Sequence, residues 1–138
     1  MAKAKMGTAS AKASSVKYVD GFVLVIPKKN LEAYKKMASE GEASWKKHGA
    51  LDYKECVGED LTPEMDGGVV PLSFLTMTKC KPNETVIFSY IGYKSRKHRD
   101  EVNTKVMKEM SETHGADMSM PFDIKRTAYG GFEVIVGA

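Results

Sequence analysis

The chain has 138 residues, 42% of them hydrophobic and 28% charged, which is typical of an ordinary globular domain long enough to bury a core. No apolar run approaches the length of a membrane span or resembles a secretory signal, so we expect no contact with a membrane. The net charge of +3 comes from residues 1–16, which hold three lysines and no acid, so residues 17–138 are neutral and a nucleic-acid-binding face is disfavoured.

The composition also predicts the domain organisation. Residues 1–16 are mainly Ala, Ser and Lys and are predicted to be a flexible tail, whereas residues 17–138 are predicted to form a single domain. The two cysteines, Cys56 and Cys80, have no metal-ligand spacing to each other or to a histidine, so no metal site and no cofactor are expected. Cys56 falls in an alternating strand pattern and is expected to be a buried thiol. Reduced cysteines favour a cytoplasmic location.

In the first half of the chain, the pattern predicts a strand, a helix and a second strand. Residues 17–26 are β-rich, and the segment FVLVI is apolar on both faces. Residues 30–48 are predicted to form an amphipathic helix that Asn30 caps and Gly49 ends. Its apolar stripe comprises Leu31, Tyr34, Ala38, Gly41, Trp45 and His48. Residues 51–60 alternate and predict a strand, with Leu51, Tyr53, Glu55 and Val57 on one side.

In the second half, residues 61–68 are predicted to be a mobile loop and residues 71–80 an extended arm or strand. Pro82 and Asn83 suit a tight turn before a strand at 85–93, so 72–93 is predicted to be a hairpin. A second helix is predicted at 95–110, with Val102, Val106 and Met110 facing inward. An irregular segment and a last strand at 127–137 follow.

The predicted order β-α-β-β-β-α-β indicates a ferredoxin-like split βαβ domain of the α+β class, with an antiparallel sheet and two helices on one face. Two helices cover one face of such a sheet, yet several strands are apolar on both faces. The uncovered face therefore needs another partner, and we expect a homodimer in which two sheets pack face to face.

Four segments resemble the YbaA-like family of small bacterial proteins. They are YVDGFVLVIPKKNLEAYKKMA, HGALDYKECVGED, TVIFSYIGYKSRKHRDEVNTKVM and MPFDIKR with YGGFEVIV, and together they span nearly all of residues 18–136. The resemblance implies a dimeric α+β barrel, a group that includes cofactor-independent monooxygenases, haem-handling proteins and stress-responsive proteins. It implies no particular activity, and fold-level likeness is a poor guide to function.

The start of the second predicted helix has an unusual charge pattern. Ser95 suits the cap position, but the first turn carries the cations Arg96, Lys97 and Arg99, which oppose the helix dipole. A capping box requires Glu or Gln where His98 stands. We therefore predict that Ser95, Arg96, His98 and Arg99 bind an anion, either a small molecule or a carboxylate of the same or the partner chain. The alternative is a solvated face compensated by the acids that follow.

Further candidate residues lie elsewhere. His48 is either a dipole partner at its helix end or a base in a pocket. Trp45 and Tyr90 either line a cavity between helices and sheet or form plain core. Asp123 either orients Arg126 or Arg99 or is a surface carboxylate.

The sequence contains no catalytic triad and no pair of acids, so it does not select one function. Three alternatives follow from the candidate residues. The first is binding of an apolar or acidic small molecule in a pocket between helices and sheet, with activity unassigned. The second is an enzyme of the cofactor-independent monooxygenase type. The third is a non-catalytic dimer that binds a partner.

Overall fold

The computed structural model describes residues 15–62, 66–115 and 119–137; most of the predicted tail and residues 63–65 of the predicted loop lie outside the described residues. In the described chain, a four-stranded antiparallel sheet has the order β2-β3-β1-β4. Its strands are β1 (Tyr18–Pro27), β2 (Asp52–Val57), β3 (Glu84–Tyr93) and β4 (Ala128–Glu133). The helices are α2 (Leu31–Lys47), α3 (Phe74–Thr78) and α4 (Arg96–His114), with 3₁₀ turns η1 (Lys28–Asn30), η2 (Asp66–Gly68) and η3 (Ile124–Arg126).

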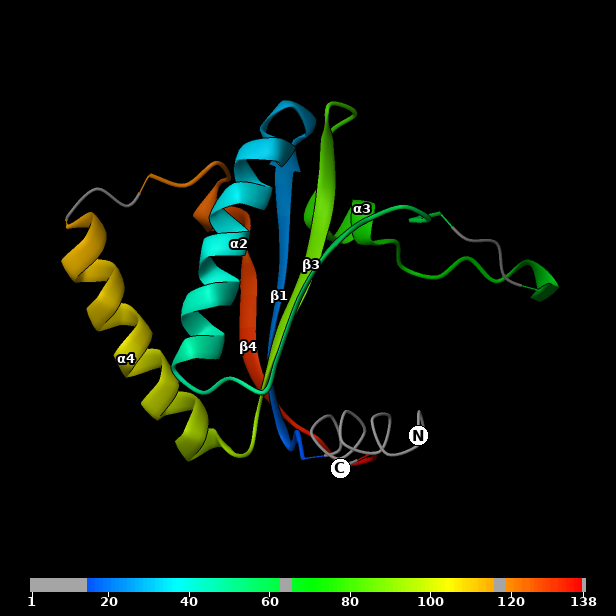
Figure 1. Ribbon diagram of the computed structural model, residues 1–138. Helices are drawn as coiled ribbons and strands as arrows, with labels where there is room; N and C mark the ends of the chain where they lie inside the picture. The colour runs from blue at the N-terminus through cyan, green and yellow to red at the C-terminus, as the bar shows by residue number, and fades with distance from the viewer. Residues whose placement is uncertain (1–14, 63–65, 116–118, 138) are drawn as a thin grey trace, which may run out of the picture.

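The two long helices lie on one side of the sheet, and α3 lies on the other (Figure 1). Alternate residues of each strand point to opposite faces, so one face of β1 carries Leu24 and Ile26 toward the helices. The core has two clusters on this face. One contains Tyr53, Tyr93, Val102 and Val106 among its members, and the other contains Leu24, Ile26, Tyr34 and Ile87. The predicted α+β class and the two helices on one face are confirmed.

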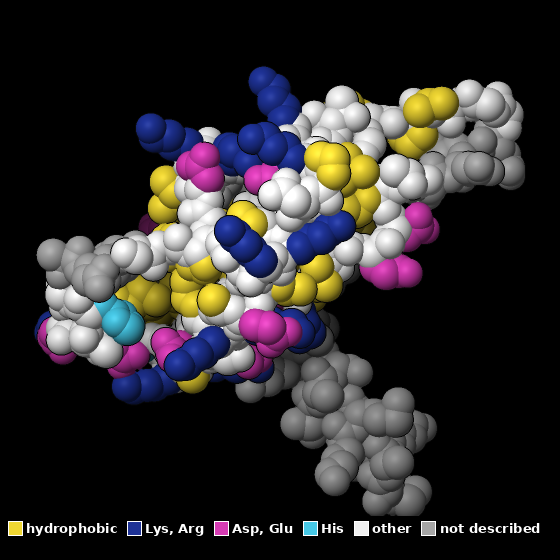
Figure 2. Space-filling model, turned by 90° about the horizontal axis from the view of Figure 1, so that it is seen from above, with side chains coloured by type: hydrophobic (Ala, Val, Ile, Leu, Met, Phe, Trp, Pro, Cys, Tyr) yellow, Lys and Arg dark blue, Asp and Glu magenta, His cyan; other side chains and the backbone are white. Residues whose placement is uncertain are grey.

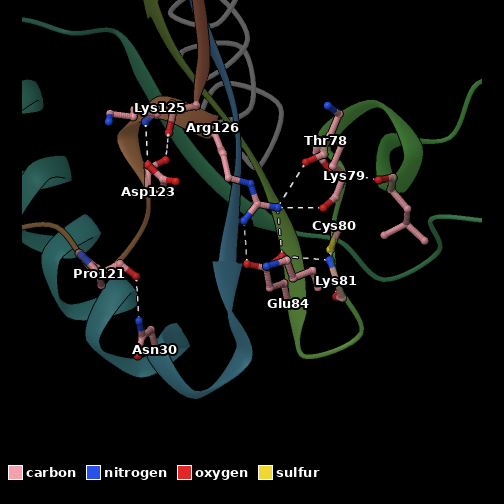
Figure 3. Close-up of polar contacts among 12 residues, drawn as sticks. Asn30, Thr78, Lys79, Cys80, Lys81, Glu84, Pro121, Asp123, Lys125 and Arg126 are labelled. Atoms are coloured by element: carbon pink, nitrogen blue, oxygen red, sulfur yellow. Dashed lines mark hydrogen bonds and ion pairs between the residues drawn. The ribbon is translucent and has the colours of Figure 1, made fainter.

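Helix α2 matches the predicted stripe, because Tyr34, Ala38 and Gly41 are its buried residues. It ends at Lys47, two residues before the predicted stop at Gly49, whose φ of 117° suits a residue without a Cβ. Asn30 stands at the cap position but makes no side-chain cap hydrogen bond. Its Nδ2 instead donates to the Pro121 carbonyl at 2.9 Å and ties the helix start to the segment before η3 (Figure 3).

Helix α4 begins as predicted, at the Ser95 cap, and buries Val102 and Val106 completely or nearly so. It runs on to His114, past the predicted end at residue 110 and into the segment predicted to be irregular. Figure 1 shows that α4 diverges from the sheet toward its C-terminal end.

Residues 71–80 were predicted to be an extended arm or a strand; the strand alternative is wrong, and with it the predicted hairpin at 72–93. Ser73 Oγ accepts a hydrogen bond from the Leu75 backbone N–H at 2.9 Å and starts α3. Lys79 ends α3 with a left-handed φ of 54°. Because these local caps close a short helix, the segment does not pair with β3, and the sheet has four strands rather than five.

Two further predictions need correction. Cys56 is exposed rather than buried, because β2 is an edge strand and Cys56 points away from the face that α2 covers. The last strand ends at Glu133 rather than at residue 137, and beyond the partly buried Val134 the side chains of Ile135 and Val136 are 86% and 87% exposed. Among the described residues, no helix combines the length and apolar character needed to cross a membrane.

Candidate functional site

A cleft of about 860 Å³ lies between α2, α4 and the helix-covered face of the sheet. Its walls are mainly apolar and include Phe22, Leu24, Met37, Ile91, Met110 and Phe122. Helix α4 diverges from the sheet (Figure 1), and residues of β1, β4 and both long helices line the cleft. A concave, largely apolar site with a few polar groups is the usual form of a small-molecule site.

At the β4 end of the cleft, Arg99 holds a buried carboxylate. Asp20 is 1% exposed, and its Oδ1 accepts a hydrogen bond from Arg99 Nη1 at 2.6 Å. The same guanidinium donates from Nε to Asp100 at 2.7 Å and lies 5.2 Å from the centre of the Tyr18 ring. Burial raises the pKa of Asp20 above that of a free aspartate, and the charge of Arg99 opposes this rise. Arg99 therefore grips a carboxylate of its own chain.

Polar side chains next to Asp20 join the two long helices. Trp45 Nε1 on α2 donates to Asn103 Oδ1 on α4 at 3.2 Å, and the Tyr93 hydroxyl donates to the same oxygen at 3.4 Å. Trp45 and Asn103 both line the cleft. Tyr129, stacked on Phe22 with ring centres 4.8 Å apart, also lines it. These groups give the apolar cleft one hydrogen-bonding wall.

A second polar wall lies between α2 and β2, where Glu55 accepts hydrogen bonds from two tyrosines. The Tyr34 hydroxyl donates to one carboxylate oxygen at 2.6 Å, and the Tyr53 hydroxyl donates to the other at 2.8 Å. Burial, followed by the nearby Glu55, raises the pKa of both tyrosines, so they stay protonated. Gly41 makes room for this arrangement, because a Cβ there would stand 2.9 Å from the Tyr53 hydroxyl.

The predicted candidate His48 lies at the rim of the cleft. Its Nε2 is 3.2 Å from Oε2 of Glu109, and this oxygen also accepts a hydrogen bond from Lys47. The other carboxylate oxygen, Oε1, accepts from the Ser44 hydroxyl at 2.6 Å. The hydrogen bonds from Lys47 and Ser44 lower the pKa of Glu109 to about 2. The cluster clamps the end of α2 to α4, and His48 belongs to this clamp rather than to the interior of the cleft.

At the N-terminus of α4, Ser95 and His98 cap the helix. Ser95 Oγ accepts from the His98 backbone N–H at 3.0 Å, and His98 Nδ1 accepts from the Lys94 backbone N–H at 2.9 Å. Burial, followed by the charge of Lys94, lowers the pKa of His98 and favours the neutral ring that can accept this bond. The His98 side chain thus resembles the Glu or Gln of a capping box, but it accepts from Lys94, one residue before the Ser95 cap. Arg96 is exposed, and binding of an external anion at this turn stays a prediction.

Three other predicted site residues lie away from the cleft. Arg126 forms two hydrogen bonds with the Glu84 carboxylate, at 2.8 and 3.0 Å, and a third with the Lys79 carbonyl at 2.9 Å (Figure 3). It therefore joins η3 to β3 and to the end of α3. The Asp123 carboxylate accepts from the Lys125 backbone N–H at 2.9 Å and starts η3. Its backbone carbonyl, rather than its side chain, accepts from the Arg126 backbone N–H at 3.1 Å. Tyr90 points to the sheet face opposite the cleft, next to Phe88.

The carboxylates that line the cleft were not predicted as site residues, although the sequence pattern marks the two that lie on strands, Asp20 and Glu55. Asp20 lies on the same face of its strand as Tyr18 and Phe22, and Glu55 lies on the same face as Tyr53 and Val57. Each acid therefore occupies a position on the helix-covered face of the sheet. An acid at an inward position requires a partner or a function. In the part of the chain that the structure describes, no group of three or more His, Cys, Asp or Glu residues is placed to hold a metal ion.

Comparison with known proteins agrees with the resemblance seen in the sequence. Residues 17–124 match the family described as "Protein of unknown function (DUF1428)". The chain is 41% identical over 121 residues to the uncharacterized protein YbaA of Escherichia coli K12, covering 88% of this chain and 98% of that protein. The YbaA protein of Shigella flexneri matches with the same identity and coverage. The chain therefore belongs to the DUF1428 family of proteins of unknown function, which includes YbaA.

Proposed function

We propose that the protein binds a largely apolar small molecule in the cleft between α2, α4 and the sheet. The observation that carries this proposal is the cleft of about 860 Å³, whose apolar walls are interrupted by hydrogen-bonding groups. Of the two ligand types expected from the sequence, the lining favours the apolar one over the acidic one. Arg99, the strongest predicted anion ligand, is engaged by Asp20 and Asp100.

A dye that fluoresces only in apolar surroundings tests this proposal. N-phenyl-1-naphthylamine, which is neutral at pH 7, should gain fluorescence with the wild-type protein and saturate at one molecule per cleft. Met107 lines the cleft and is 49% exposed, so Met107→Trp should narrow the cleft and weaken binding without disturbing the core. Lys108→Trp, at the next and exposed position of α4, should bind as the wild type does. Equal binding by both variants, or no binding by the wild type, would overturn the proposal.

A second candidate is an enzyme of the cofactor-independent monooxygenase type. The observation in its favour is Asp20, a buried carboxylate with a raised pKa that lines the cleft beside Tyr129. Such a group can accept a proton from a phenolic substrate, a step that prepares electron-rich aromatics for reaction with oxygen. Oxygen uptake with a quinol, lost in Asp20→Asn, would support this candidate, and the absence of uptake would favour binding alone.

The order β2-β3-β1-β4, with α2 and α4 on one face, supports a ferredoxin-like fold. It also supports a homodimer that packs through the opposite face of the sheet. On that face Phe88 is 48% exposed and Phe132 is 61% exposed. The charged strand residues there are paired within the chain, as Asp52 with Lys54 and Glu84 with Arg126, so two copies of the face would meet without net repulsion.

Apolar side chains beyond the sheet extend this surface. Those between β2 and β3 that are largely exposed are Val69, Val70, Leu72, Phe74 and Met77. Figure 2 shows hydrophobic side chains on the arm that projects from the body of the molecule. Large exposed apolar patches commonly mark protein interfaces.

Light scattering tests the dimer. The wild type should have the mass of two chains at micromolar concentration, and Phe88→Glu should have the mass of one. Val57→Glu serves as a control, because Val57 is 46% exposed and lies on the helix-covered side of β2. A wild-type monomer would overturn the dimer proposal. The free, unbridged Cys56 and Cys80 support a cytoplasmic location.

A further inference from the structure

We propose that the ligand of the cleft is an organic cation, an amine on an apolar body, with its ammonium group at Glu55. The inference rests on the proposed binding function and specifies the ligand class. Glu55 lines the cleft together with Tyr34, Tyr53 and Trp45. A carboxylate framed by aromatic side chains is suited to an ammonium group, which both attract.

Glu55 differs in its partners from Asp20 and Glu109, two other carboxylates that line the cleft. Asp20 is paired with Arg99, and Glu109 is paired with Lys47. Glu55 accepts hydrogen bonds from two tyrosine hydroxyls, and within the described residues it forms no ion pair with a lysine or arginine. Neutral donors hold the carboxylate in place but leave its charge uncompensated, so this wall of the cleft carries a negative charge.

Two lysines on the elements that carry Tyr34 and Tyr53 already have acidic partners. Lys54 lines the cleft, but its Nζ lies 2.6 Å from Oδ1 of Asp52. Lys35 is 3.3 Å from Glu32. Each Glu55 oxygen uses one lone pair on a tyrosine and keeps another for an incoming donor. An ammonium group with three N–H donors fits these remaining positions.

The aromatic side chains beside Glu55 supply a second attraction. The rings of Trp45 and Tyr53 lie 6.1 Å apart at 44°, and both residues line the cleft. The faces of such rings attract cations, most strongly that of tryptophan. Leu24 and Ile91 line the same cleft and would pack against the apolar body of the ligand. A carboxylate ligand would instead be repelled by Glu55.

Two matched probes test the inference. At pH 7, 2-phenylethylamine carries a positive charge and 2-phenylethanol does not, and the two are otherwise similar in shape. Trp45 is the single tryptophan of the chain, so its fluorescence reports occupancy of the cleft directly. The amine should bind the wild type about tenfold more tightly than the alcohol. Added salt should weaken amine binding more than alcohol binding.

Two variants test whether the preference for the amine comes from Glu55. Glu55→Gln keeps the shape of the side chain but removes its charge, so it should weaken amine binding and reduce the preference for the amine to about one. Glu101→Gln removes an equal charge from an exposed position outside the cleft and should keep the wild-type preference. Equal binding of both probes to the wild type, or a preference that survives in Glu55→Gln, would overturn the inference alone. Binding of neither probe would overturn the proposed function as well.

Discussion

Two inward-facing acids of the sheet, Asp20 and Glu55, have opposite environments. Asp20 is 1% exposed and depends on the Arg99 guanidinium at 2.6 Å. Glu55 is exposed on the cleft side of an edge strand and is held by two neutral hydroxyl groups. The negative charge of Asp20 is compensated by an arginine of the same chain. The Glu55 carboxylate is held in position by hydrogen bonds, but no cation compensates its charge within the described residues.

The difference separates a structural pair from a candidate binding group. A buried ion pair adds little net stability, but removal of one partner is costly because the other charge stays buried. A carboxylate held by neutral donors keeps its orientation and its charge, which is the state that suits recognition of a ligand. The predictions below test this distinction, from the largest expected effect to the smallest.

Arg99→Ala should destabilise the protein by about 3 kcal/mol at pH 7, because Asp20 would remain buried without its cation. The loss should be smaller at pH 4, where Asp20, with its raised pKa, takes up a proton more readily. Urea unfolding at the two pH values measures both effects. Arg96→Ala, in the same helical turn but exposed, should change stability by less than about 0.5 kcal/mol.

Arg99→Lys refines the same test. Arginine reaches Asp20 and Asp100 at once through two nitrogens, which a single ammonium group cannot reproduce. We expect an intermediate loss of stability. A lysine variant as stable as the wild type would show that only the charge of Arg99 is needed.

Tyr53→Phe should cost about 1–2 kcal/mol, because it removes a hydrogen bond to a charged group while the ring stays in the core. The loss should be smaller than that of Arg99→Ala, since Glu55 faces the cleft and can be hydrated. Urea unfolding of both variants under one condition gives the comparison. A larger loss of stability for Tyr53→Phe than for Arg99→Ala would contradict the view that Asp20 belongs to the structural pair and Glu55 to the binding site.

Gly41→Ala tests the space around the Tyr53 hydroxyl. Alanine in a helix interior is favoured over glycine by about 1 kcal/mol, but the added Cβ would stand 2.9 Å from that hydroxyl. The two effects should nearly cancel in the wild type. In a Tyr53→Phe background the hydroxyl is absent, so Gly41→Ala should stabilise by about 0.5–1 kcal/mol. A double-mutant cycle on thermal unfolding measures the coupling.

Glu109, the third acid, has cation partners at the exposed rim and should have the smallest effect. Its pKa in the folded protein is lowered from 4.5 to about 2, so the folded state binds fewer protons than the unfolded state between these values. The stabilisation from the clamp should be present above about pH 4.5 and be lost as the pH falls toward 2. Glu109→Gln should therefore lose less stability than the wild type between pH 5 and pH 2.5.

The long helices and strands could be predicted from the spacing of their apolar residues, because burial of an element imposes that spacing on the sequence. The apolar runs of β1 and β3 and the stripe of α2 could be recognised from neighbouring residues alone. The end of α3 depends on a left-handed Lys79, and nothing in the local pattern distinguishes that helix from an extended arm. The pairing of Asp20 with Arg99 joins residues 79 positions apart. The sequence therefore indicated that Arg99 requires an anionic partner, but it did not identify Asp20 as that partner.

The central position of β1 has a consequence for how the protein is made. This early strand pairs on one side with β3 and on the other with β4, whose Glu133 lies opposite Tyr18. While the chain is being synthesised, one edge of β1 therefore has no native neighbour until the last strand has left the ribosome. An open strand edge invites pairing with other nascent chains. Correct folding thus depends on how long this edge stays unoccupied, and a chaperone that shields it should raise the yield of native protein.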